Sequence, residues 1–208
     1  MTHLNDSLIY SAGQDGVMRL AGHDVRDLLA EFGSPLVVML EEPIRTRCRD
    51  YKKRLECYPR SRVYFASKAF LTTGFCKLME QEGMGLDVVS WGELRTALTA
   101  GFPPDQILMH GNAKTERDLT EALEAGVGRI VIDNLDEIAR LAALAAKLDK
   151  EPAVMIRVTP GVKPSTHKYV QTGQQDSKFG FNLVGGAAEE AARQVLTHER
   201  LRLVGLHC

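Results

Sequence analysis

A lysine that follows a short apolar segment is the first candidate for chemistry. Residues 63–66 (VYFA) are typical of a buried β-strand, and Lys68 follows them after one intervening residue, Ser67. An amine at the end of a buried strand loses water, which lowers its pKa and makes it a nucleophile able to form a Schiff base with an aldehyde. The alternative is a lysine whose charged end reaches solvent, and the local pattern alone favours that alternative.

Two acids lie in the next strand and helix, within the segment GLDVVSWGEL. Asp87 falls inside an apolar strand, where a carboxylate is costly unless it is paired, and Lys68 on the neighbouring strand is a suitable cation. Glu93 falls in the first turn of the helix that follows. Ser90 and Glu93 have capping-box spacing, which explains this glutamate without catalysis. Asp87 is therefore the harder of the two to explain structurally.

Further polar residues are predicted at the ends of later strands. Arg157, in VMIRV, requires an anionic partner if its strand is buried. His110 ends the strand ILM, where hydrogen bonding at a strand end explains it equally well. The long polar segment 159–180 follows the strand of Arg157. We expect this segment to belong to the active site, because α/β folds keep their chemistry at the carboxyl ends of their strands.

From about Pro35 onward, short β-branched runs alternate with stretches of helical period, which predicts βα units around a parallel sheet. The clearest helix covers 134–148, with Asn134 as its N-cap; Thr115 begins another helix that Gly126 ends, and a short helix at 24–32 ends at Gly33. The predicted strands are 36–40, 63–66, 86–89, 107–109, 129–132, 153–158 and 201–206.

Composition excludes several classes of protein. With 26 basic and 27 acidic residues among 208, the net charge is −1, as in ordinary globular proteins. The most basic stretch, 45–54, contains an acid and indicates a solvated helix face, so we expect no nucleic-acid partner. No apolar run approaches the ~20 residues of a membrane span, and the N-terminus lacks a secretion-signal profile, so we expect a cytoplasmic protein with no membrane partner. The spacing of Cys48, Cys57, Cys76 and Cys208 favours neither a disulfide scaffold nor a metal site.

The chain contains five collinear motifs: VYFASKAF, GLDVVSWGEL, HGNAKTERDL, RVTPGVKPSTHKYVQTGQQDSKFGF and VGLHC. Together they resemble the diaminopimelate decarboxylase family of pyridoxal-phosphate enzymes. This family belongs to the alanine-racemase-like group of fold type III, together with the ornithine and arginine decarboxylases. The resemblance runs from about Gly16 to Cys208, and its most specific part is PGV followed by STH, TG and SKFG.

The resemblance implies roles for individual residues and pyridoxal 5'-phosphate as the cofactor. Lys68 matches the lysine that forms the Schiff base with this cofactor. Asp87 and Glu93 match acids that line the pocket around that lysine, and Arg157 matches a pocket arginine at a strand end. His207 matches the first histidine of a family signature whose second histidine would follow Cys208.

The resemblance also implies a fold and a domain organisation. Family members have a (β/α)8 TIM-type barrel followed by a β-sandwich, and we expect about six of the eight barrel strands here. We expect residues 1–34 to form an N-terminal segment that pairs with the absent sandwich and then a short helix, and residues 35–208 to form a partial pyridoxal-phosphate barrel. On this interpretation the chain is an N-terminal fragment that is inactive alone. The full-length enzyme is a homodimer, with Lys178 near its interface.

The implied reaction is the decarboxylation of meso-2,6-diaminopimelate to L-lysine and carbon dioxide, the last step of lysine biosynthesis. One alternative is a decarboxylase of another basic amino acid or of a polyamine precursor, or a racemase, on the same fold. Another is a non-catalytic pyridoxal-phosphate-binding barrel protein, which lacks the loop from PGV to SKFG. A third is a barrel aldolase that uses Lys68 on sugar carbonyls without this cofactor.

Overall fold

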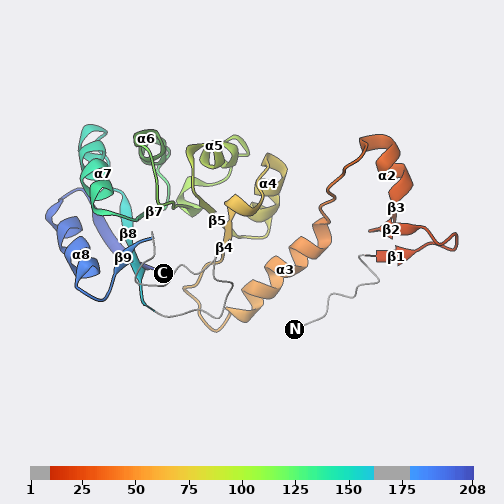
Figure 1. The fold of residues 1–208 in the computed structure, drawn as a ribbon, viewed down its shortest axis with the longest axis horizontal. Helices are drawn as coiled ribbons and strands as arrows, with labels where there is room; N and C mark the ends of the chain where they lie inside the picture. Colours follow the sequence, from red (N-terminus) through yellow and green to blue (C-terminus); the bar gives the residue numbers. More distant parts are fainter. Residues whose placement is uncertain (1–9, 162–178) are drawn as a thin grey trace. The chain divides into compact units, whose positions relative to one another are not determined.

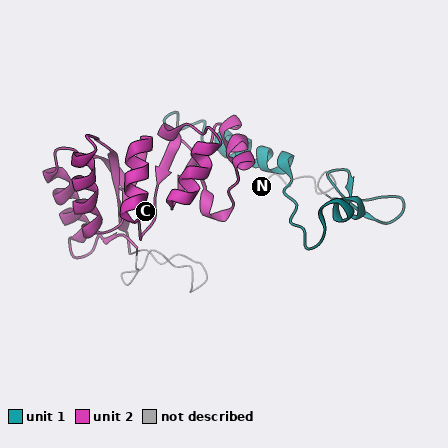
Figure 2. Ribbon diagram, turned by 90° about the horizontal axis from the view of Figure 1, so that it is seen from above, with its two compact units in different colours: residues 1–61 teal, residues 62–208 magenta. Residues whose placement is uncertain are grey.

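The computed structural model describes residues 10–161 and 179–208. The chain divides into two compact units, residues 1–61 and 62–208, and each is described by itself (Figure 2). The domain boundary predicted after residue 34 lies inside the first unit and stays a prediction.

The first unit begins with a small antiparallel sheet in the order β1-β2-β3. Its elements are β1 (Tyr10–Ala12), β2 (Met18–Leu20), β3 (His23–Asp24) and the helix α2 (Val25–Phe32). The side chain of Asp24 caps α2 by accepting from the backbone N–H of Arg26, and Gly33 ends the helix with a positive φ of 82°. The short helix predicted at 24–32 is confirmed. Of the segment expected to pair with a sandwich, residues 4–9 lie outside the described residues.

The helix α3 (Glu41–Arg54) contains the basic stretch of the sequence. Arg45 lies 2.7 Å from Glu41 and Arg49 lies 3.3 Å from Glu42, so these cations pair with acids of their own helix, as a solvated face requires. The strand predicted at 36–40 is wrong, since this segment has no regular structure. A strand needs a hydrogen-bonded neighbour as well as apolar residues. Val37 is 85% exposed, so its apolar side chain is not packed as it would be in a strand of a sheet.

The second unit is built on a parallel sheet, whose main path runs β10-β8-β7-β6-β5-β4, with the short β9 paired to β8. The six strands of this path confirm the expected α/β class and the expected number of barrel strands. Its helices α4 to α8 pack against one another in chain order and form a row along the sheet (Figure 1). The strands are β4 (Tyr64–Ala66), β5 (Gly85–Val88), β6 (Ile107–Met109), β7 (Arg129–Ile132), β8 (Ala153–Thr159), β9 (Phe181–Asn182) and β10 (Arg202–His207). The helical elements are η1 (Ser67–Ala69), α4 (Thr73–Gln81), α5 (Trp91–Thr99), η2 (Pro104–Gln106), α6 (Glu116–Ala125), α7 (Leu135–Lys147) and α8 (Ala187–Thr197).

Local signals fix the ends of the best-predicted helices. Asn134 caps α7 by accepting a 3.0 Å hydrogen bond from the backbone N–H of Glu137. Thr115 and Asp118 form a reciprocal capping box at the start of α6, and Gly126 ends this helix in the left-handed region at φ 70°. These predicted boundaries are confirmed.

The core lies between the central strands and their helices. Leu86, Met109, Ile130 and Ile156 are each at most 1% exposed, as expected for parallel strands covered by helices. By contrast, β4 pairs only with β5 among the described strands, and its residues are half-buried or exposed. The expectation of a fully buried strand before Lys68 is therefore wrong, because β4 is an edge strand here.

The sheet is strongly curved. His110 follows β6 and His207 ends β10, which lies three positions away in the strand order. In a flat sheet, neighbouring strands about 4.8 Å apart would separate these positions by about 14 Å. The imidazole centroids are instead 4.4 Å apart, so the sheet bends towards the face that carries these rings.

Candidate functional site

The predicted site residues gather at the carboxyl end of the parallel sheet. Lys68 lies in η1, directly after β4, and Asp87 is the next-to-last residue of β5. Asp87 aligns with Ala66 of β4, which places it beside the start of η1. Arg157 and His207 face each other in the register of β8 and β10. A parallel sheet brings all these positions to one end because all its strands run in the same direction.

A cluster of Asp87, His110 and His207 occupies the concave part of this end. Asp87 Oδ2 lies 3.5 Å from His110 Nδ1, and the His110 ring packs on the His207 ring with a tilt of 58°. Three buried atoms of this cluster, Asp87 Oδ1, His110 Nε2 and His207 Nδ1, have no hydrogen-bond partner among the described residues. Buried polar atoms are normally satisfied, so this end of the sheet offers polar atoms for a group that the described residues do not provide.

Burial controls the protonation of His207. Loss of solvent around the ring lowers its pKa from 6.5 to about 4, and repulsion from His110 and Arg157 acts in the same direction. The ring of His207 is therefore neutral near pH 7. A neutral imidazole presents one donor and one acceptor nitrogen.

Arg157 has the anionic partner that its position requires. Its Nη1 lies 3.1 Å from Asp133 Oδ1, and the backbone N–H of Gly180 donates to Asp133 Oδ2 at 3.2 Å. The guanidinium also lies over the ring of Phe179, 4.4 Å from its centroid. Asp133 thus holds the guanidinium and the backbone of the chain just before β9 in one place.

Lys68 is exposed, and its predicted pairing with Asp87 is not present. The close polar contact that Asp87 makes among the described residues is with His110. The cause lies in β4, which has a single neighbour among the described strands, so η1 stands at the edge of the described sheet. The amine nevertheless belongs to the same end of the sheet as the cluster of Asp87, His110 and His207.

Glu93 has a local structural role at the start of α5. Its backbone N–H donates to Ser90 Oγ at 3.3 Å, as capping-box spacing predicts. Its side chain differs from the standard box, because Oε2 accepts from the backbone N–H of Val89 at 2.7 Å. The carboxylate therefore fixes the turn between β5 and α5, next to Asp87.

Sequence reasoning gave no role in the site to Asp133, Lys114 or Glu137, which are all buried at this end of the sheet. Asp133 had a usable signal, because it directly follows the apolar strand RIVI, just as the Lys68 turn follows VYFA. Lys114 stands in a polar segment and carries no such signal. Residues 162–178, which contain Lys178 and most of the predicted active-site loop, lie outside the described residues.

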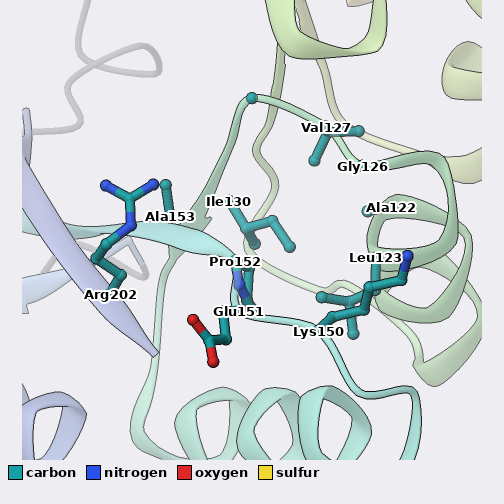
Figure 3. Close-up of a pocket in the computed structure, with 11 residues that line it drawn as sticks. Ala122, Leu123, Gly126, Val127, Ile130, Lys150, Glu151, Pro152, Ala153 and Arg202 are labelled. Carbon is teal, nitrogen blue, oxygen red and sulfur yellow. The ribbon is translucent and has the colours of Figure 1, made fainter. Parts of the chain in front are cut away.

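A cavity of about 320 Å³ lies at the opposite, amino-terminal end of the sheet. It is formed by the end of α6, the segments before β7 and β8, and the first residue of β10 (Figure 3). None of the predicted site residues lines this cavity. Within the described residues, no group of His, Cys, Asp and Glu side chains has the arrangement of a metal site, and no helix is long and apolar enough to cross a membrane.

Comparison with known proteins gives a consistent result. The family model described as the pyridoxal-binding domain of pyridoxal-dependent decarboxylases matches residues 41–208. The diaminopimelate decarboxylase of Actinosynnema pretiosum is 46% identical over 93% of this chain and 43% of its own length. That of Bacillus subtilis is 44% identical over 94% of this chain and 45% of its own. The chain therefore spans less than half the length of these relatives.

Solved structures match the fold. A crystal structure of diaminopimelate decarboxylase from M. jannaschii in co-complex with L-lysine matches with a TM-score of 0.85 and 31% identity, over 96% of this chain and 47% of the other. The Helicobacter pylori enzyme complexed with L-lysine matches with a TM-score of 0.79 over 88% of this chain and 46% of the other. At 24% identity the second match shows the fold alone. The α/β class predicted from the sequence is confirmed, as part of the architecture found in these barrel-containing decarboxylases.

Proposed function

Because the chain belongs to the family of pyridoxal-dependent decarboxylases through its pyridoxal-binding domain, we propose that it binds pyridoxal 5'-phosphate and forms the cofactor-binding part of a diaminopimelate decarboxylase. The complete reaction would convert meso-2,6-diaminopimelate to L-lysine and carbon dioxide in lysine biosynthesis. The observation that carries this proposal is the family match over 41–208, joined to identities of 46% and 44% with curated diaminopimelate decarboxylases.

The carboxyl end of the sheet fits such a cofactor chemically. Asp87 Oδ1, His110 Nε2, His207 Nδ1 and Ser67 Oγ are buried without hydrogen-bond partners among the described residues. Pyridoxal phosphate presents a ring nitrogen, a hydroxyl group and a phosphate, which can use such donors and acceptors. These atoms and the amine of Lys68 lie at the same carboxyl end of the sheet, which supports binding there.

When bound, pyridoxal phosphate supplies an aldehyde for amines and a ring that accepts the electrons left by a departing carboxylate. Lys68 would hold the aldehyde end and would release it when the substrate amine takes its place. Asp87 would hold an ammonium group near that position, and Glu93 would keep Asp87 in place through the turn at Val89. Arg157, oriented by Asp133, would bind an anionic group of cofactor or substrate.

Replacing Lys68 with Ala tests the proposed attachment. We expect the wild-type chain, loaded with pyridoxal phosphate and reduced with borohydride, to carry a covalent cofactor on the peptide that contains residue 68. The Lys68→Ala chain should lose this adduct and the visible absorbance of the bound cofactor. Lys77→Ala, which changes another exposed lysine in the second unit, is the control and should keep both signals. An adduct on another lysine would contradict the assignment.

Carbon dioxide release tests the reaction. The chain itself, and a chimaera joining it to the C-terminal part of the Bacillus subtilis relative, would be incubated with diaminopimelate, lysine, ornithine and arginine. We expect the chimaera to release carbon dioxide from diaminopimelate by preference. Release from another amino acid alone would favour a decarboxylase of different specificity. Cofactor binding without any release from the chimaera would favour a non-catalytic binding protein.

The cytoplasmic location and the homodimer expected from the sequence are part of the same proposal. For the dimer, sedimentation of the chimaera should give a mass near twice that of one chain, and a monomer with full activity would contradict it. For the location, fractionation of cells that express the protein should place it with cytoplasmic markers.

A further inference from the structure

A buried ion pair lies at the same end of the sheet as the candidate site, and its partners are residues that the sequence did not predict for catalysis. Lys114 Nζ lies 2.8 Å from Glu137 Oε1, and both side chains have 0% exposure. Lys114 stands between β6 and α6, and Glu137 lies in the first turn of α7. Lysine and glutamate are almost never fully buried without a partner, so the position of each depends on the other.

The ammonium of Lys114 joins two strand ends. It donates to the carbonyl oxygen of Gly111 at 2.6 Å and to that of Val131 at 2.7 Å, in addition to its contact with Glu137. Gly111 directly follows His110 and has a φ of 110°, a backbone conformation that residues other than glycine rarely adopt. The turn that presents His110 is therefore fastened to β7 through a lysine from outside the strands.

Glu137 continues the same network towards Arg157. Its Oε2 accepts from the backbone N–H of Asp133 at 3.4 Å. The carboxylate of Asp133 in turn binds the guanidinium of Arg157 and the backbone N–H of Gly180. Polar contacts thus run without interruption from the His110 turn to the side chain of Arg157, across the ends of β6, β7 and β8.

Stability alone is a poor explanation for this pair. Burial lowers the pKa of Lys114 and raises the pKa of Glu137, so the surroundings disfavour the charged form of both groups. Replacing a buried ion pair by apolar residues of similar volume is often neutral or stabilising. The effect that distinguishes this pair from an apolar replacement is that its hydrogen bonds fix the geometry of the strand ends that it joins.

We infer that Lys114 and Glu137 are positioning residues for the cofactor site, holding the His110 turn and the Asp133–Arg157 pair in the arrangement that binds pyridoxal phosphate. This inference rests on the proposed function. Neither residue touches the cofactor in this account, because both act through Gly111, Val131 and Asp133.

The test replaces both residues of the pair. Removing only one would leave an uncompensated buried charge, and the resulting loss of stability would say nothing about positioning. The variant is Lys114→Met with Glu137→Leu. The matched control is Arg193→Met with Glu189→Leu, which removes an exposed ion pair of the same kind from α8. Urea unfolding reports stability, titration with pyridoxal phosphate reports the dissociation constant, and nitrogen NMR of the histidine side chains reports the His110 and His207 environment without cofactor.

We expect the buried-pair variant to stay folded without urea and to unfold cooperatively at a lower urea concentration than the wild type, because the carbonyl oxygens of Gly111 and Val131 lose their donor. Its dissociation constant for pyridoxal phosphate should rise at least tenfold, and its His110 and His207 resonances should shift before any cofactor is added. The control should change none of these quantities. An unchanged dissociation constant in a folded variant would overturn the inference, and so would failure of the double variant to fold, because the pair would then serve the fold itself. A wild-type chain that binds no pyridoxal phosphate would instead overturn the proposed function.

Discussion

The low pKa of His207 makes stability depend on pH in a predictable direction. The pKa of this histidine is about 4 in the folded chain and 6.5 in the unfolded chain. Between these values the unfolded chain binds more protons, so the free energy of unfolding falls as the pH is lowered through 6.5 towards 4. Above pH 6.5 the ring is neutral in both states and this loss is absent.

The size of the effect follows from the two pKa values. From pH 7.5 to pH 5, the linkage relation gives a loss of about 2 kcal/mol for a fully enclosed ring. The ring of His207 is only partly enclosed, and solvent screening reduces the expected loss to about 1 kcal/mol. The charged and titratable groups that face the His207 ring are His110, Arg157, Asp87 and Asp133. All four are present in both the wild type and a His207 variant, so the difference between the two proteins gives the contribution of His207.

Urea unfolding of the wild type and of His207→Gln at pH 7.5 and pH 5 measures this contribution. The wild type should lose about 1 kcal/mol more than the variant between the two pH values. His23→Gln, at an exposed position in the first unit, is the control and should follow the wild type. Equal pH dependence in the wild type and His207→Gln, or a His207 pKa near 6.5 by NMR titration, would refute the argument from burial.

Three further measurements test other parts of the structure. Gly128→Ala should lower the free energy of unfolding by roughly 3 kcal/mol or more, because the added Cβ would overlap the carbonyl oxygen of Asp105. Gly126→Ala should lower it by about 1 kcal/mol, because its only strain is the left-handed φ of 70°. A larger loss for Gly126→Ala than for Gly128→Ala in urea unfolding would contradict this. Thr115→Ala should cost about 1 kcal/mol by the same assay, since it removes the capping box of α6, and an unchanged unfolding midpoint would count against that cap. Burial raises the pKa of the Cys76 thiol to about 11, so iodoacetamide at pH 8 should label exposed Cys57 and leave Cys76 unmodified in the folded chain, as peptide mass spectrometry would show.

The elements of the second unit were largely predictable from the sequence. The strands at 107–109 and 129–132 were predicted at the positions of β6 and β7, because buried parallel strands are short apolar runs between helical segments. Asn134, Thr115 and Gly126 mark helix ends by local hydrogen bonding and backbone conformation, which a sequence shows directly. The segment 36–40 has the same apolar composition without a strand, since pairing depends on a neighbour that a local pattern does not contain.

The candidate site was predictable only in part. The sequence placed Asp87 inside a strand and Arg157 near the end of another, and the family resemblance added His207. The structure brings all three to one end of the sheet. The contact between the His110 and His207 rings depends on sheet curvature, which no local pattern encodes. The burial of Lys114 depends on Glu137 in a later helix, so the polar segment around Lys114 did not indicate that this lysine is buried. The roles of Lys68, Asp87, Glu93, Arg157 and His207 stay predictions.

The ring contact between His110 and His207 has a consequence for the order in which the protein acquires its site during synthesis. β10 is the last strand of the described sheet in chain order. It must pair with β8 before its last residue, His207, can contact His110 at the end of β6. Folding that proceeds from the N-terminal end can therefore form most helices and strands while the cofactor face is still incomplete. Substitutions that slow the docking of β10 should delay the gain of cofactor binding while leaving the early rise in helical signal unchanged.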